Sequence, residues 1–116
     1  MKNQDVIRNR YLRDDLPTRL GGLAANLGRI KSFSSHESNK ESVKTLIDES
    51  KFFIERTAAE ADINSAAELV ELQIQLARWG RNLENIWEDA AQRDQVAEQA
   101  IQWSKLVLKI SGLWIE

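Results

Sequence analysis

The sequence predicts one all-α domain over residues 1–116, folded as an antiparallel, up-down-up-down four-helix bundle. Four segments repeat apolar residues at steps of three and four, the spacing that keeps them on one face of a helix. Proline occurs once, and no segment shows the alternation of apolar and polar residues that is typical of a half-buried strand. Because short connections join the four segments, consecutive helices should be neighbours that run in opposite directions.

The first helix is expected at about residues 17–34. Pro17 suits its first turn, where the backbone amide has no partner within the helix. Asp14 or Asp15 places a negative charge near the positive end of the helix dipole. The core stripe of this helix is formed by Leu16, Leu20, Leu23, Leu27 and Ile30.

The second helix is expected at about residues 39–62. Ser38 and Glu41 have the spacing of a capping box, in which each side chain bonds a free backbone amide at the helix start. The apolar face begins with Val43 and Ile47 and continues to Ala61.

The third helix is expected at about residues 66–88, and it opens with a second capping box, Ser65 with Glu68. Its periodicity is the strongest in the chain. The stripe is formed by Leu69, Leu72, Leu76, Trp79, Leu83 and Ile86.

The fourth helix is expected at about residues 93–111, after a short turn in which Asp89 or Asp94 caps it. Gly112 suits the left-handed conformation that commonly ends a helix. Residues 1–14 are expected to form an N-terminal arm or a short extra helix. The stripe of the fourth helix is formed by Val96, Ala100, Trp103, Val107, Ile110 and Trp114.

Two sets of residues indicate how the helices should pack. Gly21, Ala25 and Gly28 fall along one edge of the first helix, so a neighbouring helix should approach closely there. Tryptophans fall on or beside the core stripes of the last two helices, where each can bury a large area. They are Trp79, Trp87, Trp103 and Trp114.

The composition excludes several kinds of chemistry. The chain has no cysteine, which removes disulfides and thiolate chemistry and suits a reducing cytoplasm. No stretch approaches the roughly 18–20 apolar residues of a membrane span, and a net charge of −2 argues against nucleic acid as a partner. A single histidine leaves no Glu-x-x-His pairs for a di-iron site, and we expect no metal or other cofactor.

Arg29 and His36 are separated by six residues. This spacing resembles the arginine–histidine signature of HEPN-type ribonucleases, which are small helical bundles that act as dimers. The resemblance covers these two positions alone, and it implies a ribonuclease or an inactive relative of one. The other interpretation of His36 is a solvated histidine in a loop.

Apolar residues that the core stripes leave unused form the candidate interface. They are Phe52, Val70, Ile74, Ile101 and Leu108. A helix with so wide an apolar arc lies either at the centre of a structure or in an interface. We therefore predict a non-enzymatic protein that forms a homodimer or binds a partner helix. A HEPN-like ribonuclease and a small-molecule-binding bundle are the alternatives.

Overall fold

The computed structural model describes residues 15–112, and within this range every regular element is helical. The all-α class predicted from the sequence is therefore confirmed. The elements are α2 (Leu16–Phe33), α3 (Lys40–Thr57), α4 (Ile63–Arg81), α5 (Leu83–Trp87) and α6 (Ala90–Ser111), with 3₁₀ turns at Glu37–Asn39 and Ala58–Glu60. The predicted arm at residues 1–14 and Trp114 lie outside the described residues.

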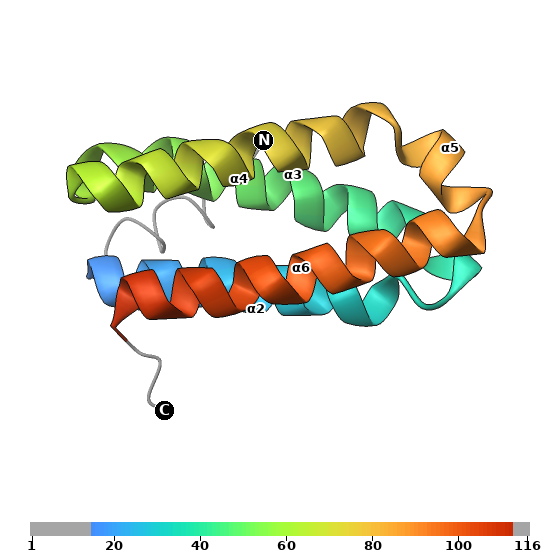
Figure 1. Ribbon diagram of the computed structural model, residues 1–116, viewed down its shortest axis with the longest axis horizontal. Helices are drawn as coiled ribbons and strands as arrows, with labels where there is room; N and C mark the ends of the chain where they lie inside the picture. The colour runs from blue at the N-terminus through green and yellow to red at the C-terminus, as the bar shows by residue number, and fades with distance from the viewer. Residues whose placement is uncertain (1–14, 113–116) are drawn as a thin grey trace, which may run out of the picture.

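The four long helices lie lengthwise in a bundle-like arrangement, and the short α5 sits at one end between α4 and α6 (Figure 1). The most extensive contacts join α2 to α6, and α2 to α3. Next in extent is the packing of α3 against α4. By contrast, α4 and α6 touch each other only slightly, so the side of the structure between them is the least closed.

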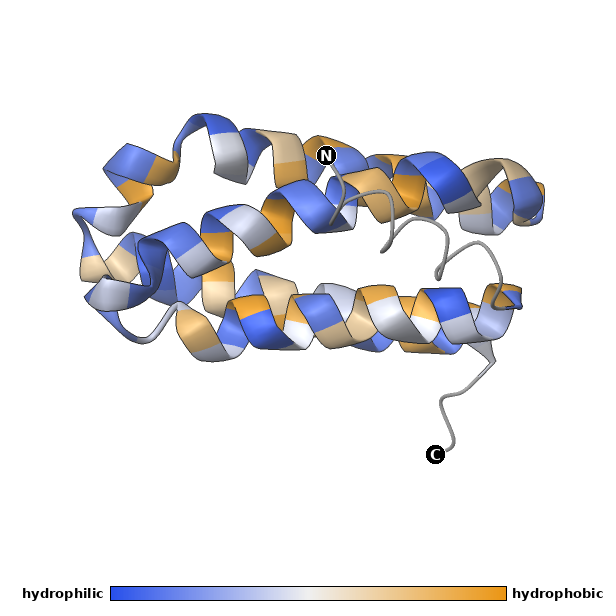
Figure 2. Cartoon of the chain, turned by 180° about the vertical axis from the view of Figure 1, so that it is seen from behind, coloured by the Kyte–Doolittle hydropathy of each residue, from blue (hydrophilic) through white to orange (hydrophobic). Residues whose placement is uncertain are grey.

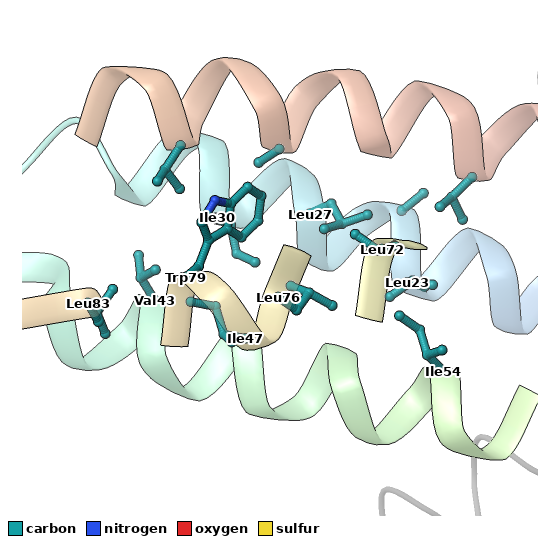
Figure 3. Packing of buried hydrophobic residues seen from close by; sticks show 14 of the residues in the cluster. Leu23, Leu27, Ile30, Val43, Ile47, Ile54, Leu72, Leu76, Trp79 and Leu83 are labelled. Carbon is teal, nitrogen blue, oxygen red and sulfur yellow. The ribbon is translucent and has the colours of Figure 1, made fainter. Parts of the chain in front are cut away.

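Each long helix alternates hydrophobic and hydrophilic residues around its axis (Figure 2). Apolar side chains from α2, α3, α4 and α5 point toward one another between the helices (Figure 3). The stripes predicted for the first three helices are largely buried: Leu23, Leu27, Ile30, Val43, Ile47, Leu69, Leu72 and Leu76 are among the least exposed residues. Burial of this apolar surface is the main favourable term in folding.

The buried stripe of α6 differs from the predicted one. Val96, Ala100 and Val107 are buried as expected, but Ser104 is buried as well, and Trp103 is half-buried. The hydroxyl of Ser104 donates a hydrogen bond of 2.8 Å to the backbone oxygen of Ala24 in α2. A small side chain with a satisfied hydroxyl lets α2 and α6 approach closely, which explains why this position is turned inward.

Neither predicted capping box forms. The carboxylate of Asp62 accepts the amide of Ser65 at 2.8 Å and so starts α4 three residues before the predicted 66. At the start of α3, Ser38 itself lies in the 3₁₀ turn Glu37–Asn39, and Asn39 precedes the helix without a side-chain cap. Asp15 and Asp89, two of the acids named at the expected helix starts, cap α2 and α6, and Gly112 ends α6 with a φ of 79°. Because Asp89 is the cap, α6 begins at Ala90, three residues before the expected 93.

The predicted helices at 39–62 and 66–88 each end earlier than expected. The first gives way at Thr57 to the 3₁₀ turn Ala58–Glu60, which the extended backbone of Ala61 ends. The second breaks at Asn82, whose side-chain amide donates to the backbone oxygen of Arg78 at 3.0 Å. The backbone amide of Asn82 donates to the same carbonyl at 3.1 Å, so both groups of Asn82 hold the end of α4 before α5 begins in a new direction.

The expected close packing at Gly28 is absent. A Cβ added there would meet no heavy atom within 4 Å among the described residues. Gly28 therefore does not serve as a contact point for another helix.

Candidate functional site

The outer face of α4 is the most apolar exposed surface among the described residues. Exposed fractions reach 84% for Ile63, 51% for Val70 and 41% for Ile74. These are three of the four large hydrophobic residues that are exposed in the described part of the chain, the fourth being Phe33. Large apolar side chains gathered on one face are typical of interaction sites, whereas single scattered ones are not.

These residues belong to a continuous line along the whole of α4, which we call the outer stripe. Its members are Ile63, Ala67, Val70, Ile74, Ala77 and Arg81, and all of them are exposed. At about 100° per residue, the outer stripe lies roughly opposite the buried face formed by Leu69, Leu72 and Leu76. One face of α4 thus packs in the core, while the opposite face is solvent-facing, apolar from Ile63 to Ala77 and charged at Arg81.

The length of the outer stripe depends on where α4 begins. Because Asp62 caps the helix, Ile63 becomes its first residue and continues the line that Val70 and Ile74 define. A helix that started at residue 66, as the sequence predicts, would lack this first turn.

Charged residues flank the outer stripe on one side. Glu71 and Arg78 lie about 80° and 60° around the helix from Ile63, whereas Ala66, Gln73 and Gly80 occupy the other flank. Neither Glu71 nor Arg78 forms an ion pair with another described residue. The charges beside the stripe are therefore free to meet groups from another molecule.

The structure brings two of the five predicted interface residues together and separates the other three. Val70 and Ile74 lie one turn apart on α4, both exposed. Phe52 is half-buried on α3, with the guanidinium of Arg56 at 5.0 Å from its ring centre. On α6, Ile101 is half-buried and Leu108 packs against the core. Ile63, which the sequence analysis does not single out, joins the first pair.

A polar cleft of about 550 Å³ lies where α4, α5 and α6 meet. Trp79, Ile86 and Val96 contribute apolar surface, and Arg78 contributes a positive charge. The remaining lining residues all carry side-chain amides: Gln75, Asn82, Asn85, Gln92, Gln95 and Gln99. A second cleft of about 330 Å³ shares Gln75 and Gln99 with the first, so the two are adjoining parts of one groove between α4 and α6.

The sequence does indicate this groove, but through the spacing of glutamines and not through the spacing of apolar residues. Glutamines recur on α6 at steps of three and four, at Gln92, Gln95, Gln99 and Gln102, so they share one face of the helix. That face borders the cleft. Aromatic residues alone would leave the cavity without polar groups to orient a ligand. The glutamine amides supply such groups, because each can both donate and accept hydrogen bonds.

Arg29 and His36, the pair that resembles the ribonuclease signature, are both exposed. The guanidinium of Arg29 donates to the side-chain oxygen of Asn26 at 2.9 Å, and Asn26 in turn donates to Glu49. His36 lies at the turn that follows α2. No hydrogen bond joins Arg29 to His36 within residues 15–112, and the resemblance stays a prediction.

The shifted pKa values all arise from helix caps and from ion pairs between helices or turns. Hydrogen bonding to Thr18, to Ser65 and to Gln92 lowers the pKa of Asp15, Asp62 and Asp89, which are the helix caps. The hydrogen bond from Arg19 lowers the pKa of Glu60, and the one to Glu84 raises the pKa of Lys40. None of these groups lines the amide cleft.

The described range has neither a cluster of metal-binding side chains nor a helix that could span a membrane. Residues 15–112 contain no group of three or more His, Cys, Asp or Glu side chains placed to hold a metal ion. In the same range no helix combines the length and apolar character needed to cross a membrane.

Comparison with known proteins identifies no relative. No family model, no curated protein and no solved structure matches this chain.

Proposed function

We propose that this protein is a non-enzymatic helical module that associates with itself through the outer stripe of α4. The observation that carries this proposal is the line of exposed apolar residues, above all Ile63, Val70 and Ile74, on the face of α4 that turns away from the core. Moving such surface out of water is favourable by roughly 25 cal/mol per Å² of apolar area. The same face would also suit an amphipathic helix from a partner protein.

The proposed architecture behind this surface is the up-down-up-down four-helix bundle. The direction of the colour change along α2, α3, α4 and α6 in Figure 1 supports it, since it reverses from each long helix to the next. In such a bundle every helix has one face on the core and one toward solvent. A solvent-facing apolar stripe is then surface that the single chain does not need.

A homodimer is the simplest assembly that would cover the outer stripe. Two-subunit cyclic assemblies are the commonest oligomers, and twofold symmetry lets one self-complementary patch bury itself. We propose the cytoplasm as the location, because a chain without cysteine suits a reducing compartment.

The proposal is tested by the molecular mass in solution. The wild type should exceed the 13.3 kDa of one chain as its concentration rises, and Ile74→Lys should return it to that mass. A lysine on the outer stripe would place a charge against apolar surface, which opposes association. Ser42→Lys, at an exposed position on α3, is the matched control and should leave the mass unchanged.

Circular dichroism completes this experiment. Ile74→Lys should keep the helical content of the wild type, because Ile74 lies outside the core. A wild type that stays at 13.3 kDa at every concentration would contradict self-association.

A small-molecule-binding function is the second candidate, and the amide-lined cleft favours it. Ligand sites are typically clefts of roughly 300–1,000 Å³, and the volume of the cleft between α4, α5 and α6 falls in that range. Polar side chains dominate its lining, whereas most ligand sites have mainly apolar walls. Its lining, with six amides and one cation, suits a neutral or weakly anionic polar molecule. A titration with such compounds, monitored by the NMR signals of the Gln95 and Gln99 side-chain amides, would test this function. The Gln99→Leu variant serves as the comparison.

A further inference from the structure

We propose that the outer stripe of α4 pairs with the same stripe of a second copy of this chain, with the two α4 helices antiparallel. This inference rests on the proposed function, since it names the orientation in which the two copies meet. It depends on two properties of α4: the spacing of the stripe and the distribution of charge beside it.

The spacing of the outer stripe is that of a helix-pairing seam. From Ile63 to Arg81 the steps are four, three, four, three and four residues. Apolar residues at this spacing interlock with a second helix that carries the same spacing, as in a coiled coil. The seam extends for about 27 Å at 1.5 Å per residue.

The charges beside the stripe select the orientation. Glu71 and Arg78 share one flank, with the acid nearer the start of α4 and the base nearer its end. The other flank, with Ala66, Gln73 and Gly80, carries no charge.

In an antiparallel pair the charged flank of one copy lies beside the charged flank of the other. With the twofold axis midway between these two residues, Glu71 of each copy faces Arg78 of the other copy, which makes two equivalent ion pairs. In this register residues 68–81 of the two α4 helices overlap, over about 20 Å, and Ile63 lies beyond the overlap. In a parallel pair the charged flank would instead face the uncharged one, and neither ion pair could form. Charge complementarity therefore favours the antiparallel arrangement.

Charge reversal tests this arrangement directly. Arg78→Glu should weaken self-association by about tenfold, because Glu71 would then face an acid in the second copy. Glu71→Arg should weaken it similarly, since it places two arginines together. An equimolar mixture of the two variants should associate at least as well as the wild type, because each pair across the interface is again of opposite sign. If each variant alone associated as strongly as the wild type, the antiparallel pairing would be contradicted.

Distances between labels test the orientation independently. The chain has no cysteine, so a single spin label can be attached to Ile63→Cys, where the stripe has its most exposed large hydrophobic residue. With the twofold axis midway between Glu71 and Arg78, the two labelled positions should lie about 35 Å apart along α4. In a parallel pair they would lie roughly 10 Å apart, the usual distance between packed helices.

The outcomes separate this inference from the proposed function. A short distance between Ile63 labels would overturn the antiparallel pairing and leave self-association through α4 intact. A monomeric wild type would overturn both, and it would leave residues 1–14 of the same chain or a different protein as the group that covers the stripe.

Discussion

Asp62 determines where α4 begins, and its contribution can be measured against that of Ser65. Asp62→Ala should lower the melting temperature by a few degrees, because the amide of Ser65 loses its acceptor at the helix start. Ser65→Ala should have a smaller effect, since it removes the hydroxyl that also bonds Asp62 but keeps the backbone amide. Equal effects of both substitutions in thermal unfolding would contradict the assignment of Asp62 as the cap.

Gly28 offers a stabilising substitution. Glycine in a helix interior costs about 0.5–1 kcal/mol relative to alanine, and no described atom would meet the added Cβ within 4 Å. Gly28→Ala should therefore raise the free energy of unfolding by roughly that amount in chemical denaturation. A loss of stability would show that this position is more closely packed than the structure indicates.

Trp79 and Trp103 should differ in their contribution to stability. Trp79 is only 3% exposed, so Trp79→Ala should cost about 3–5 kcal/mol through lost contacts and a residual cavity. Trp103 is half-buried beside the groove, and its replacement by alanine should cost no more than about 2 kcal/mol. Denaturant unfolding of the two variants measures both values, and a reversed order would contradict the described core.

At the scale of elements, an ion pair joins the start of α2 to the connection between α3 and α4. Both terminal guanidinium nitrogens of Arg19 donate to the carboxylate of Glu60 at 2.6 Å, and Arg19 is 4% exposed. The ion pair lowers the pKa of Glu60 from 4.5, so its contribution to stability is present above that value and is lost as the pH falls through the lowered pKa.

Acid unfolding tests this link. As the pH decreases below 4.5, the wild type should lose stability more steeply than Glu60→Gln, which has no carboxylate to protonate at this position. Glu98→Gln serves as the control, because Glu98 forms no ion pair with the described residues. Parallel acid profiles for the wild type and Glu60→Gln would show that the Arg19 ion pair does not contribute.

The apolar periodicity was sufficient to predict the long helices, because burial of one face dominates their placement. It was insufficient where a polar side chain makes a specific hydrogen bond. Ser104 turns inward because Ala24 accepts its hydroxyl, and α4 ends at Asn82 because that side chain bonds Arg78. Serine and asparagine are polar, so the spacing of apolar residues does not indicate how they are placed. Their placement depends on hydrogen-bond partners that are distant in the sequence or on local geometry.

At the scale of the whole molecule, the candidate site was predicted in part. Val70 and Ile74 could be assigned to an outer face, because they lie opposite the strongest core stripe in the chain. Ile63 was missed because its place on the same face depends on the cap at Asp62. The amide cleft was missed because it depends on how far apart α4 and α6 lie, which no local pattern expresses.

The central claim, that α4 associates through its outer stripe, is tested most directly by methyl NMR of the wild type on dilution. The methyl signals of Val70 and Ile74 should shift together as the protein is diluted, because these side chains leave an apolar contact and enter water. The signals of Ile101 and of the buried Ile47 should stay constant, since neither belongs to the stripe. Constant signals at Val70 and Ile74 over the whole range of concentration would contradict the claim, as would shifts confined to Ile101.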